Sequence, residues 1–126
     1  LFAAIRERMP VDPDPWSAEF AMWDTSNGSS IWRKPIPANA TPRLSSMLVR
    51  LAMNEDGSLA AVARCQADRA ASDLIVLDAA TGEIIFEFQT PGNCTALDLA
   101  GRRVALAGCC ERSGGRGRGV ARVFDV

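Results

Sequence analysis

The chain of 126 residues is 48% apolar and 23% charged, and its 14 Lys and Arg against 15 Asp and Glu leave a formal charge of −1. These values are typical of one ordinary folded domain and exclude collagen-like, disordered and strongly charged chains. The sequence contains no His, which excludes Ser-His-Asp and Cys-His nucleophiles, His general bases and mixed Cys/His zinc sites within this chain.

Short apolar runs bounded by Gly, Pro and polar turns predict a nearly all-β chain. Residues 1–9 contain Ala, Arg and Glu, which favour a helix, and only their place in the repeat described below predicts a strand there. The run Glu83 to Gln89 is mostly apolar without clean alternation, which predicts a strand buried on both faces. In chain order, the predicted strands cover residues 1–6, 20–24, 30–35, 48–53, 59–64, 74–78, 83–89, 96–99, 104–108 and 121–125.

Three of these runs end in Asp, at Asp24, Asp78 and Asp125, and so indicate an internal repeat. The separations of 54 and 47 positions are a little above the roughly 40–50 residues of one unit in propeller-type repeat proteins. After the first two Asp residues the sequence continues alike, with three residues, a Gly, three residues and then Trp32 or Phe86. Because these carboxylates recur with the repeat, we interpret them as turn caps and not as catalytic groups.

The repeat divides the chain into a half unit at residues 1–24 and full units at 25–78 and 79–126, all within one domain. Each full unit contains four predicted strands. Polar connections of variable length join some of these strands and predict surface loops. The loops cover residues 9–17, 35–46, 66–72 and 111–119.

The strand and turn pattern from Asn54 to Leu59, followed by Leu77 to Gly82, resembles β-propeller repeats of the WD40 type. Trp23-Asp24 is a literal Trp-Asp pair, and Leu77-Asp78 and Phe124-Asp125 are degenerate copies of it. The resemblance covers nearly the whole chain, although residues 35–46 fit only as an insertion. Because the chain has no His, it lacks the Gly-His element of a WD40 unit and the hydrogen-bonded network that this element forms.

The spacing of Asp, Gly and aromatic residue, with Thr81 before Gly82, is also similar to the docking motif of quinoprotein-type propellers. In that family the aromatic residue stacks against the neighbouring blade, which implies that Trp32 and Phe86 each pack between blades. Both resemblances imply the same all-β fold, a β-propeller segment of four-stranded antiparallel blades. The repeat signature comprises Trp23, Asp24, Gly28, Trp32, Asp56, Gly57, Asp78, Gly82, Phe86 and Asp125.

Two and a half units form only an incomplete ring, because closed propellers use roughly four to eight four-stranded blades. Open sheet faces and unpaired strand edges need neighbours that bury them. We therefore expect a segment of a larger propeller, with the remaining blades supplied by a parent chain or by neighbouring chains.

The four cysteines, at positions 65, 94, 109 and 110, include no Cys-x-x-Cys pair, so a structural zinc site is not expected. Cys65 and Cys109 end equivalent predicted strands, which favours a role as small packing residues. In an oxidising compartment a disulfide could form among the cysteines, and the sequence does not determine which of them would pair. Since no secretion signal or membrane span is visible, we expect reduced thiols and a cytoplasmic or other intracellular location.

The segment Arg112 to Gly119 is a short Arg-Gly sequence of a kind that contacts RNA. Aromatic residues are missing from it, Glu111 precedes it, and the chain lacks the basic surplus that phosphate binding needs. A solvated loop between two strands is the simpler interpretation. Arg112, Arg116 and Arg118 are then candidates for contacts with a partner.

The sequence indicates no catalytic residue, cofactor or metal site, and the chain is not expected to be an enzyme. The function that we predict is that of a non-catalytic protein–protein interaction or scaffold module, a segment of a WD40-like propeller that binds other subunits of a multiprotein assembly through its variable loops. One alternative, implied by resemblance, is a blade segment of a quinoprotein-type (PQQ-like) propeller enzyme or periplasmic assembly protein. A second alternative is RNA contact through the Arg-Gly loop.

Overall fold

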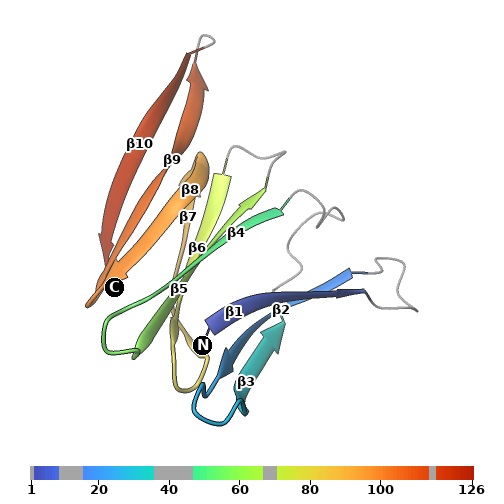
Figure 1. Cartoon of the computed structure of the whole chain (residues 1–126). Helices are drawn as coiled ribbons and strands as arrows, with labels where there is room; N and C mark the ends of the chain where they lie inside the picture. Colours follow the sequence, from blue (N-terminus) through green and yellow to red (C-terminus); the bar gives the residue numbers. More distant parts are fainter. Residues whose placement is uncertain (1, 9–15, 36–46, 67–70, 114–115) are drawn as a thin grey trace.

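The computed structural model describes residues 2–8, 16–35, 47–66, 71–113 and 116–126, with side chains for 19–35, 49–64, 71–92, 94–108 and 119–126. Within these ranges the chain forms ten strands and no helix (Figure 1), so the predicted all-β class is confirmed. The strands are β1 (Phe2–Arg8), β2 (Trp16–Trp23), β3 (Ser30–Pro35), β4 (Met47–Met53), β5 (Leu59–Gln66), β6 (Ala71–Asp78), β7 (Ile84–Pro91), β8 (Asn93–Ala100), β9 (Arg103–Ser113) and β10 (Arg116–Asp125).

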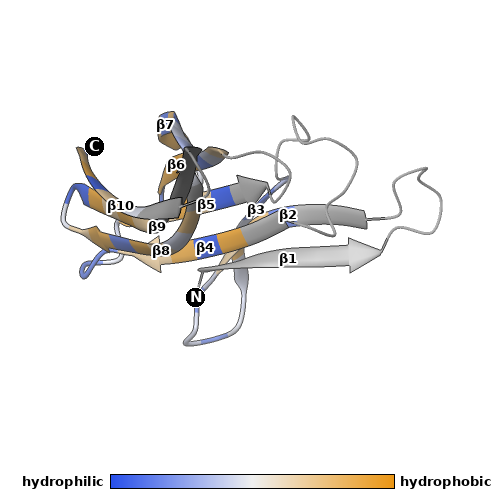
Figure 2. Cartoon of the chain, turned by 90° about the horizontal axis from the view of Figure 1, so that it is seen from above, coloured by the Kyte–Doolittle hydropathy of each residue, from blue (hydrophilic) through white to orange (hydrophobic). Residues whose placement is uncertain are grey.

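These strands form three open antiparallel sheets that follow one another in space as they do in sequence (Figure 1). We call them the N-terminal sheet (β1-β2-β3), the central sheet (β4-β5-β6-β7) and the C-terminal sheet (β8-β9-β10). Within each sheet, every strand pairs with the next one along the chain. The first strands β1, β4 and β8 lie side by side along one edge of the stack (Figure 2).

The strand predicted near the N-terminus is β1, which forms in spite of its helix-favouring composition. Its backbone pairs with β2 along its whole length, from Phe2 opposite Met22 to Arg8 opposite Trp16. This ladder is a tertiary interaction that overrides the weak local preference for a helix.

The sequence repeat and the observed sheets are offset by one strand. Units 25–78 and 79–126 begin just before β3 and β7, but these strands pair with β2 and β6 of the sheet before them. Tight Asp-Gly turns fold β3 and β7 back onto the preceding strand and so keep each of them in that strand's sheet.

Two apolar cores hold the three sheets together. One core lies between the N-terminal and central sheets, and the other lies between the central and C-terminal sheets. Strands β5 and β6 supply both cores, because their residues alternate between the two faces of the central sheet. The first core contains Phe20, Met22, Ala60, Val62, Ile75, Leu77 and Ala79, and the second contains Leu59, Ala61, Ala63, Leu74, Val76, Cys94, Leu99, Val104 and Leu106.

The prediction that residues Glu83 to Gln89 are buried on both faces is wrong. They lie in β7, where Ile84 is 51% and Phe88 is 42% exposed. The reason is position, since β7 is the last strand of the central sheet and pairs only with β6 in the described part of the chain. Double-sided burial belongs to the inner strands β5 and β6 instead.

Most of the residues predicted as a loop at 111–119 lie in strands. Strand β9 continues to Ser113 and β10 starts at Arg116, so much of the Arg-Gly sequence pairs as a hairpin. The ladder can form there because backbone hydrogen bonds need no particular side chain. Its register shifts between Gly117 and Gly119, as at a β-bulge.

Candidate interaction site

Two turns of the chain share one geometry, the Asp24 turn between β2 and β3 and the Asp78 turn between β6 and β7. In the second, the Asp78 amide donates to the Glu83 carbonyl at 2.9 Å and the Gly82 amide donates to the Asp78 carbonyl at 2.8 Å. The first repeats both bonds at 2.9 and 2.8 Å. Gly28 and Gly82 have φ values of 72° and 71°, a left-handed conformation that side chains rarely adopt.

The Asp side chains close these turns. The Asp78 carboxylate accepts hydrogen bonds from the amides of Ala80 and Thr81, at 3.0 and 2.8 Å, and from the Thr81 hydroxyl at 3.1 Å. The Asp24 carboxylate accepts from the Ser26 amide at 2.8 Å and the Ser26 hydroxyl at 2.7 Å. Hydrogen bonds to the charged form favour it, and they hold the pKa of both carboxyl groups below its usual range. In the described structure the carboxylates of Asp24 and Asp78 therefore cap their own turns.

Trp32 of β3 connects the N-terminal sheet to the Asp78 turn of the central sheet. Its indole N–H donates to the carbonyl of Ala79 at 2.8 Å. Its ring lies so close to Gly82 that a Cβ atom there would be 2.8 Å from Cδ2 of the indole. Gly82 thus serves two purposes, because it allows the positive φ and the close approach of Trp32. Two residues of the predicted signature, Trp32 and Gly82, meet in this contact, and a third, Asp78, caps the turn that carries Gly82.

Trp23, which precedes Asp24, lies in β2 next to a small charged cluster. The Arg33 guanidinium is 5.9 Å from the centre of the Trp23 ring, a distance within reach of a cation–π interaction. The same guanidinium donates to the Glu19 carboxylate at 2.9 Å. These contacts join β2 to β3 within the N-terminal sheet.

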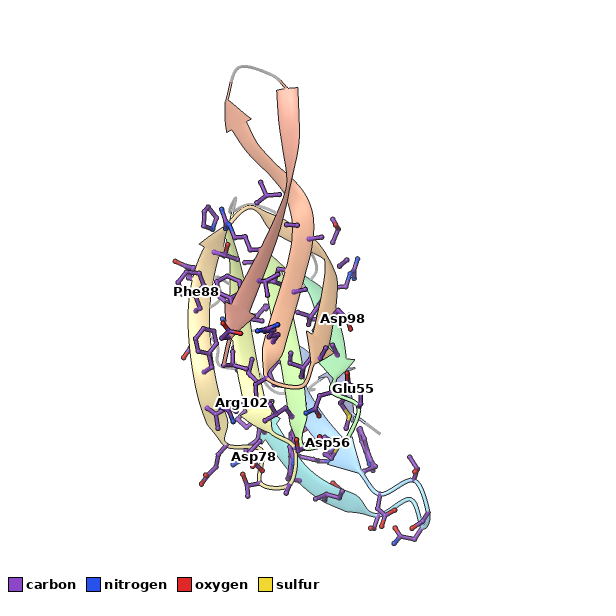
Figure 3. All side chains as sticks on the ribbon, turned by 90° about the vertical axis from the view of Figure 1, so that its left-hand side faces the viewer. Glu55, Asp56, Asp78, Phe88, Asp98 and Arg102 are labelled. Carbon is purple, nitrogen blue, oxygen red and sulfur yellow. The ribbon has the colours of Figure 1, made fainter. Side chains whose placement is uncertain are left out.

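The Asp56-Gly57 turn between β4 and β5 lies against the Asp78 turn. The Asp56 carboxylate accepts from the Ser58 amide at 2.9 Å, and Gly57 has a φ of 72°. The amide of Ala79 donates to the Ser58 carbonyl at 2.8 Å. Asp56 and Asp78 accordingly lie at the same end of the central sheet (Figure 3).

The β4–β5 turn also binds the C-terminal sheet. The buried side chain of Asn54 accepts from the Leu59 amide at 2.9 Å and donates to the Gly101 carbonyl at 3.3 Å. The Gly101 amide donates to Glu55 at 3.0 Å and thereby lowers the pKa of that carboxyl group. The β4–β5 turn thus binds both backbone groups of Gly101, the carbonyl through Asn54 and the amide through Glu55.

Asp125 and Phe86 are the last members of the signature. Asp125 ends β10 and makes an exposed ion pair with Arg103 at 3.0 Å. The Val126 amide donates to the Arg102 carbonyl at 2.9 Å, as Ala79 does to Ser58. Phe86 packs against Phe124, with ring centres 6.3 Å apart. Phe86 therefore bridges the central and C-terminal sheets through a strand residue, whereas Trp32 reaches a turn.

The residues expected to contact partners are described only in part. Arg112 lies opposite Gly117 and Arg116 lies opposite Ser113 in the β9–β10 ladder, while Arg118 lies in β10. Their side chains are outside the described set, as are residues 9–15, 36–46, 67–70 and 114–115 of the predicted loops. The proposed RNA contact therefore stays a prediction.

A buried ion pair that the sequence analysis missed lies at the other end of the central sheet. Arg64 of β5 donates to the Asp73 carboxylate of β6 at 2.6 Å, and its side chain is 4% exposed. The Gln89 amide donates to the second oxygen of Asp73 at 3.0 Å. Arg64 and Asp73 are directly opposite in the ladder. The sequence contained no signal for this pair, because the predicted loop at residues 66–72 does not fix the register that sets Arg64 opposite Asp73.

A largely apolar cavity of about 540 Å³ opens between the N-terminal and central sheets. Lys34 and Glu83 are its charged members. Its lining comprises Phe20, Lys34, Pro35, Ile75, Leu77, Gly82, Glu83 and Ile84.

No protein-family model matches the chain, and no curated protein matches it. The part of the chain that the structure describes contains no group of three or more His, Cys, Asp and Glu residues placed to hold a metal ion. It also contains no helix that is long and apolar enough to cross a membrane.

Proposed function

We propose that the chain is a non-catalytic protein–protein interaction module, a segment of a larger propeller-like assembly of stacked sheets. The observation that carries this proposal is the outer face of the C-terminal sheet. This face is directed away from the central sheet and is seen in Figure 3, where Asp98 marks it.

Small apolar residues occupy the centre of this outer face. Val123 pairs with Ala105, and Ala121 pairs with Ala107. These residues alternate with Val104, Leu106 and Phe124, which face the central sheet and pack in the second core. All four residues of the outer face are exposed, and Val123 is 66% exposed.

The central sheet carries the same arrangement on a face that is covered. Val76 lies two residues before Asp78, as Val123 lies two residues before Asp125. Their partners in the ladder are Ala61 and Ala105, which are therefore equivalent as well. Ala61 and Val76 are fully buried because the C-terminal sheet packs against them. The repeat thus places an exposed apolar surface where its preceding copy forms an interface, and a further sheet from another part of the assembly would bury it.

The test is affinity purification of the tagged chain from its native host, with quantitative mass spectrometry of the proteins that accompany it. Val123→Glu places a charge on the outer face, and Ile31→Glu is a matched control at an exposed position of the N-terminal sheet. Circular dichroism verifies that both variants fold. We expect Val123→Glu to lose stoichiometric partners that the wild type and the control retain. Retention of the same partners by Val123→Glu would contradict the proposal, as would a wild-type chain that carries none.

A second candidate function is a blade segment of a quinoprotein-type propeller enzyme or periplasmic assembly protein. What supports it is the contact of Trp32 with Gly82 and Ala79 of the neighbouring sheet, because an aromatic residue after an Asp-Gly turn docks in this way in the family that the sequence resembles. The resemblance implies that a calcium-coordinating cluster lies elsewhere in the full chain; among the described residues no metal-ligand cluster is found. Quinone-dependent dye reduction by the native assembly would support this candidate. If the assembly reduces no dye, that result would count against a quinoprotein-type enzyme.

A further inference from the structure

Three of the four Asn residues in this chain are followed, two positions later, by Ser or Thr. The segments are Asn27-Gly28-Ser29, Asn39-Ala40-Thr41 and Asn93-Cys94-Thr95. Ser and Thr make up 14 of the 126 residues, so chance would create this pattern at the four Asn residues less than once. With no Pro in the middle, the pattern is the acceptor motif for N-linked glycans, which lie on protein surfaces. The fourth Asn, Asn54, lacks the motif, and its buried side chain binds the next sheet instead.

Asn27 is the acceptor whose side chain lies within the described part of the structure. It belongs to the turn between β2 and β3, at the end of the N-terminal sheet (Figure 1), and residues 25–30 of this turn are all exposed. A Cβ atom built on the neighbouring Gly28 meets nothing within 4 Å. The turn therefore leaves room for a bulky sugar beside Asn27.

The exposure of Asn27 does not require that the N-terminal sheet lack a neighbour on its other side. Thr81 holds the equivalent place in the Asp78 turn, three residues after the Asp and one before the Gly. In that turn Trp32 of the preceding sheet packs on Gly82, which is buried, yet Thr81 stays exposed. A sheet packed on Gly28 in the same way would thus leave Asn27 accessible.

We propose that Asn27 is an N-glycosylation site, which receives an oligosaccharide from a polyprenyl diphosphate donor. In the transfer, Nδ2 of Asn27 forms a bond to C1 of the first sugar and loses one proton. The bond from C1 to the diphosphate breaks, and the diphosphate leaves with the electron pair. The modified side chain keeps its place in the turn, because Oδ1 still accepts from the Ser29 amide at 2.7 Å and the remaining N–H of Nδ2 still donates to Asp24 at 3.2 Å.

This inference goes beyond the proposed function, because it concerns a covalent modification of one turn and not a partner on the outer face of the C-terminal sheet. It also differs from the intracellular location expected from the sequence, since this motif is modified in secreted proteins. The glycan is detected without any partner protein, so its absence would leave the proposal about the outer face untouched.

The test is peptide mapping of the native protein isolated from its host. Trypsin places the four Asn residues in four different peptides. An N-glycosidase in heavy-oxygen water converts each glycosylated Asn to labelled Asp, and a parallel digest without the enzyme measures spontaneous deamidation, to which Asn-Gly pairs are prone. We expect enzyme-dependent label at Asn27 in most copies and none at Asn54, the internal control. No such label at Asn27 would overturn the proposal, whatever is found at Asn39 and Asn93.

Secretion of the chain from a eukaryotic host, with an added leader, tests the acceptor motif itself. Ser29→Ala removes the motif but keeps the turn, since the hydrogen bonds of the turn use only the backbone of Ser29. We expect this variant to lose the gel shift of one glycan, which Ser29→Thr and the matched control Ser30→Ala should retain. A glycan on Asn27 that survives Ser29→Ala would contradict the proposal, as would a shift in the secreted chain without label in the native protein.

Discussion

Replacing Gly82 by Ala tests whether the contact with Trp32 stabilises the stack of sheets. Two penalties act at this position. An Ala in the left-handed region is disfavoured by about 1–2 kcal/mol. The new Cβ atom would also lie 2.8 Å from Cδ2 and 3.1 Å from Cε2 of Trp32, so the ring must move.

Gly28 separates the two penalties. It has nearly the same φ as Gly82, but a Cβ atom built on it meets nothing within 4 Å. Gly28→Ala should therefore show the backbone penalty alone. Moving the indole disturbs the bond to the Ala79 carbonyl, worth about 0.5–1.5 kcal/mol, and overpacking adds about 1–3 kcal/mol. We expect Gly82→Ala to destabilise the chain by about 2–4 kcal/mol more than Gly28→Ala does.

Urea denaturation followed by far-ultraviolet circular dichroism measures both variants. With a slope m of about 1–3 kcal/mol per molar urea, the expected difference in stability corresponds to a shift of roughly 0.7–4 M in the urea midpoint. In a Trp32→Ala background most of the excess destabilisation of Gly82→Ala should disappear, since the remaining close neighbour, Cε of Lys34 at 3.1 Å, belongs to the end of a flexible side chain. Equal shifts for Gly82→Ala and Gly28→Ala in the wild-type background would refute the reasoning, as would an excess that persists without the indole.

Three further predictions concern the turns and the buried ion pair. Turn hydrogen bonds hold the pKa of Asp24, Asp56 and Asp78 below the ordinary Asp value, so their stabilisation is present above about pH 3.9 and is lost as the pH falls through the lowered values. Melting temperatures between pH 2 and 7 should fall less steeply in acid for Asp78→Asn than for the wild type. Asn54→Ala removes the bonds to Leu59 and Gly101 and should destabilise the chain in urea by about 1–3 kcal/mol, whereas the exposed Asn27→Ala should change stability much less. Arg64→Met leaves Asp73 without its guanidinium partner and should destabilise by about 3–5 kcal/mol, and adding Asp73→Asn should recover part of that loss; no recovery would contradict the charge argument.

The local pattern of this chain was sufficient to predict where its strands lie. Each observed strand overlaps a predicted run, and Ser30–Pro35 coincides with β3. The Asp-Gly spacing located both turns that share one geometry, because a left-handed position and a carboxylate cap are requirements of the local backbone. Trp32, which the resemblance implies to pack between blades, contacts Ala79 and Gly82 of the central sheet; that these sheets are propeller blades stays a prediction.

Properties that depend on neighbouring sheets were predicted less well. Residues Glu83 to Gln89 are as apolar as a strand buried on both faces, but β7 lies at the end of its sheet and exposes Ile84 and Phe88. The pairing of Arg64 with Asp73 was missed because a charged residue in an apolar run has no visible partner until the hairpin register is known. Burial and ion pairing are decided by the strands that lie opposite, and these are not neighbours in sequence.

The sequence by itself determined the strand class, the turn chemistry and the recurrence of the repeat, because all three depend on residues within a few positions of one another. Only the tertiary structure decided which sheet each strand joins, which of two apolar faces is covered and which edge is open. Val76 and Val123 occupy equivalent places in the repeat, yet one is fully buried and the other is 66% exposed. The difference arises because the C-terminal sheet packs on the first residue, while no described sheet packs on the second.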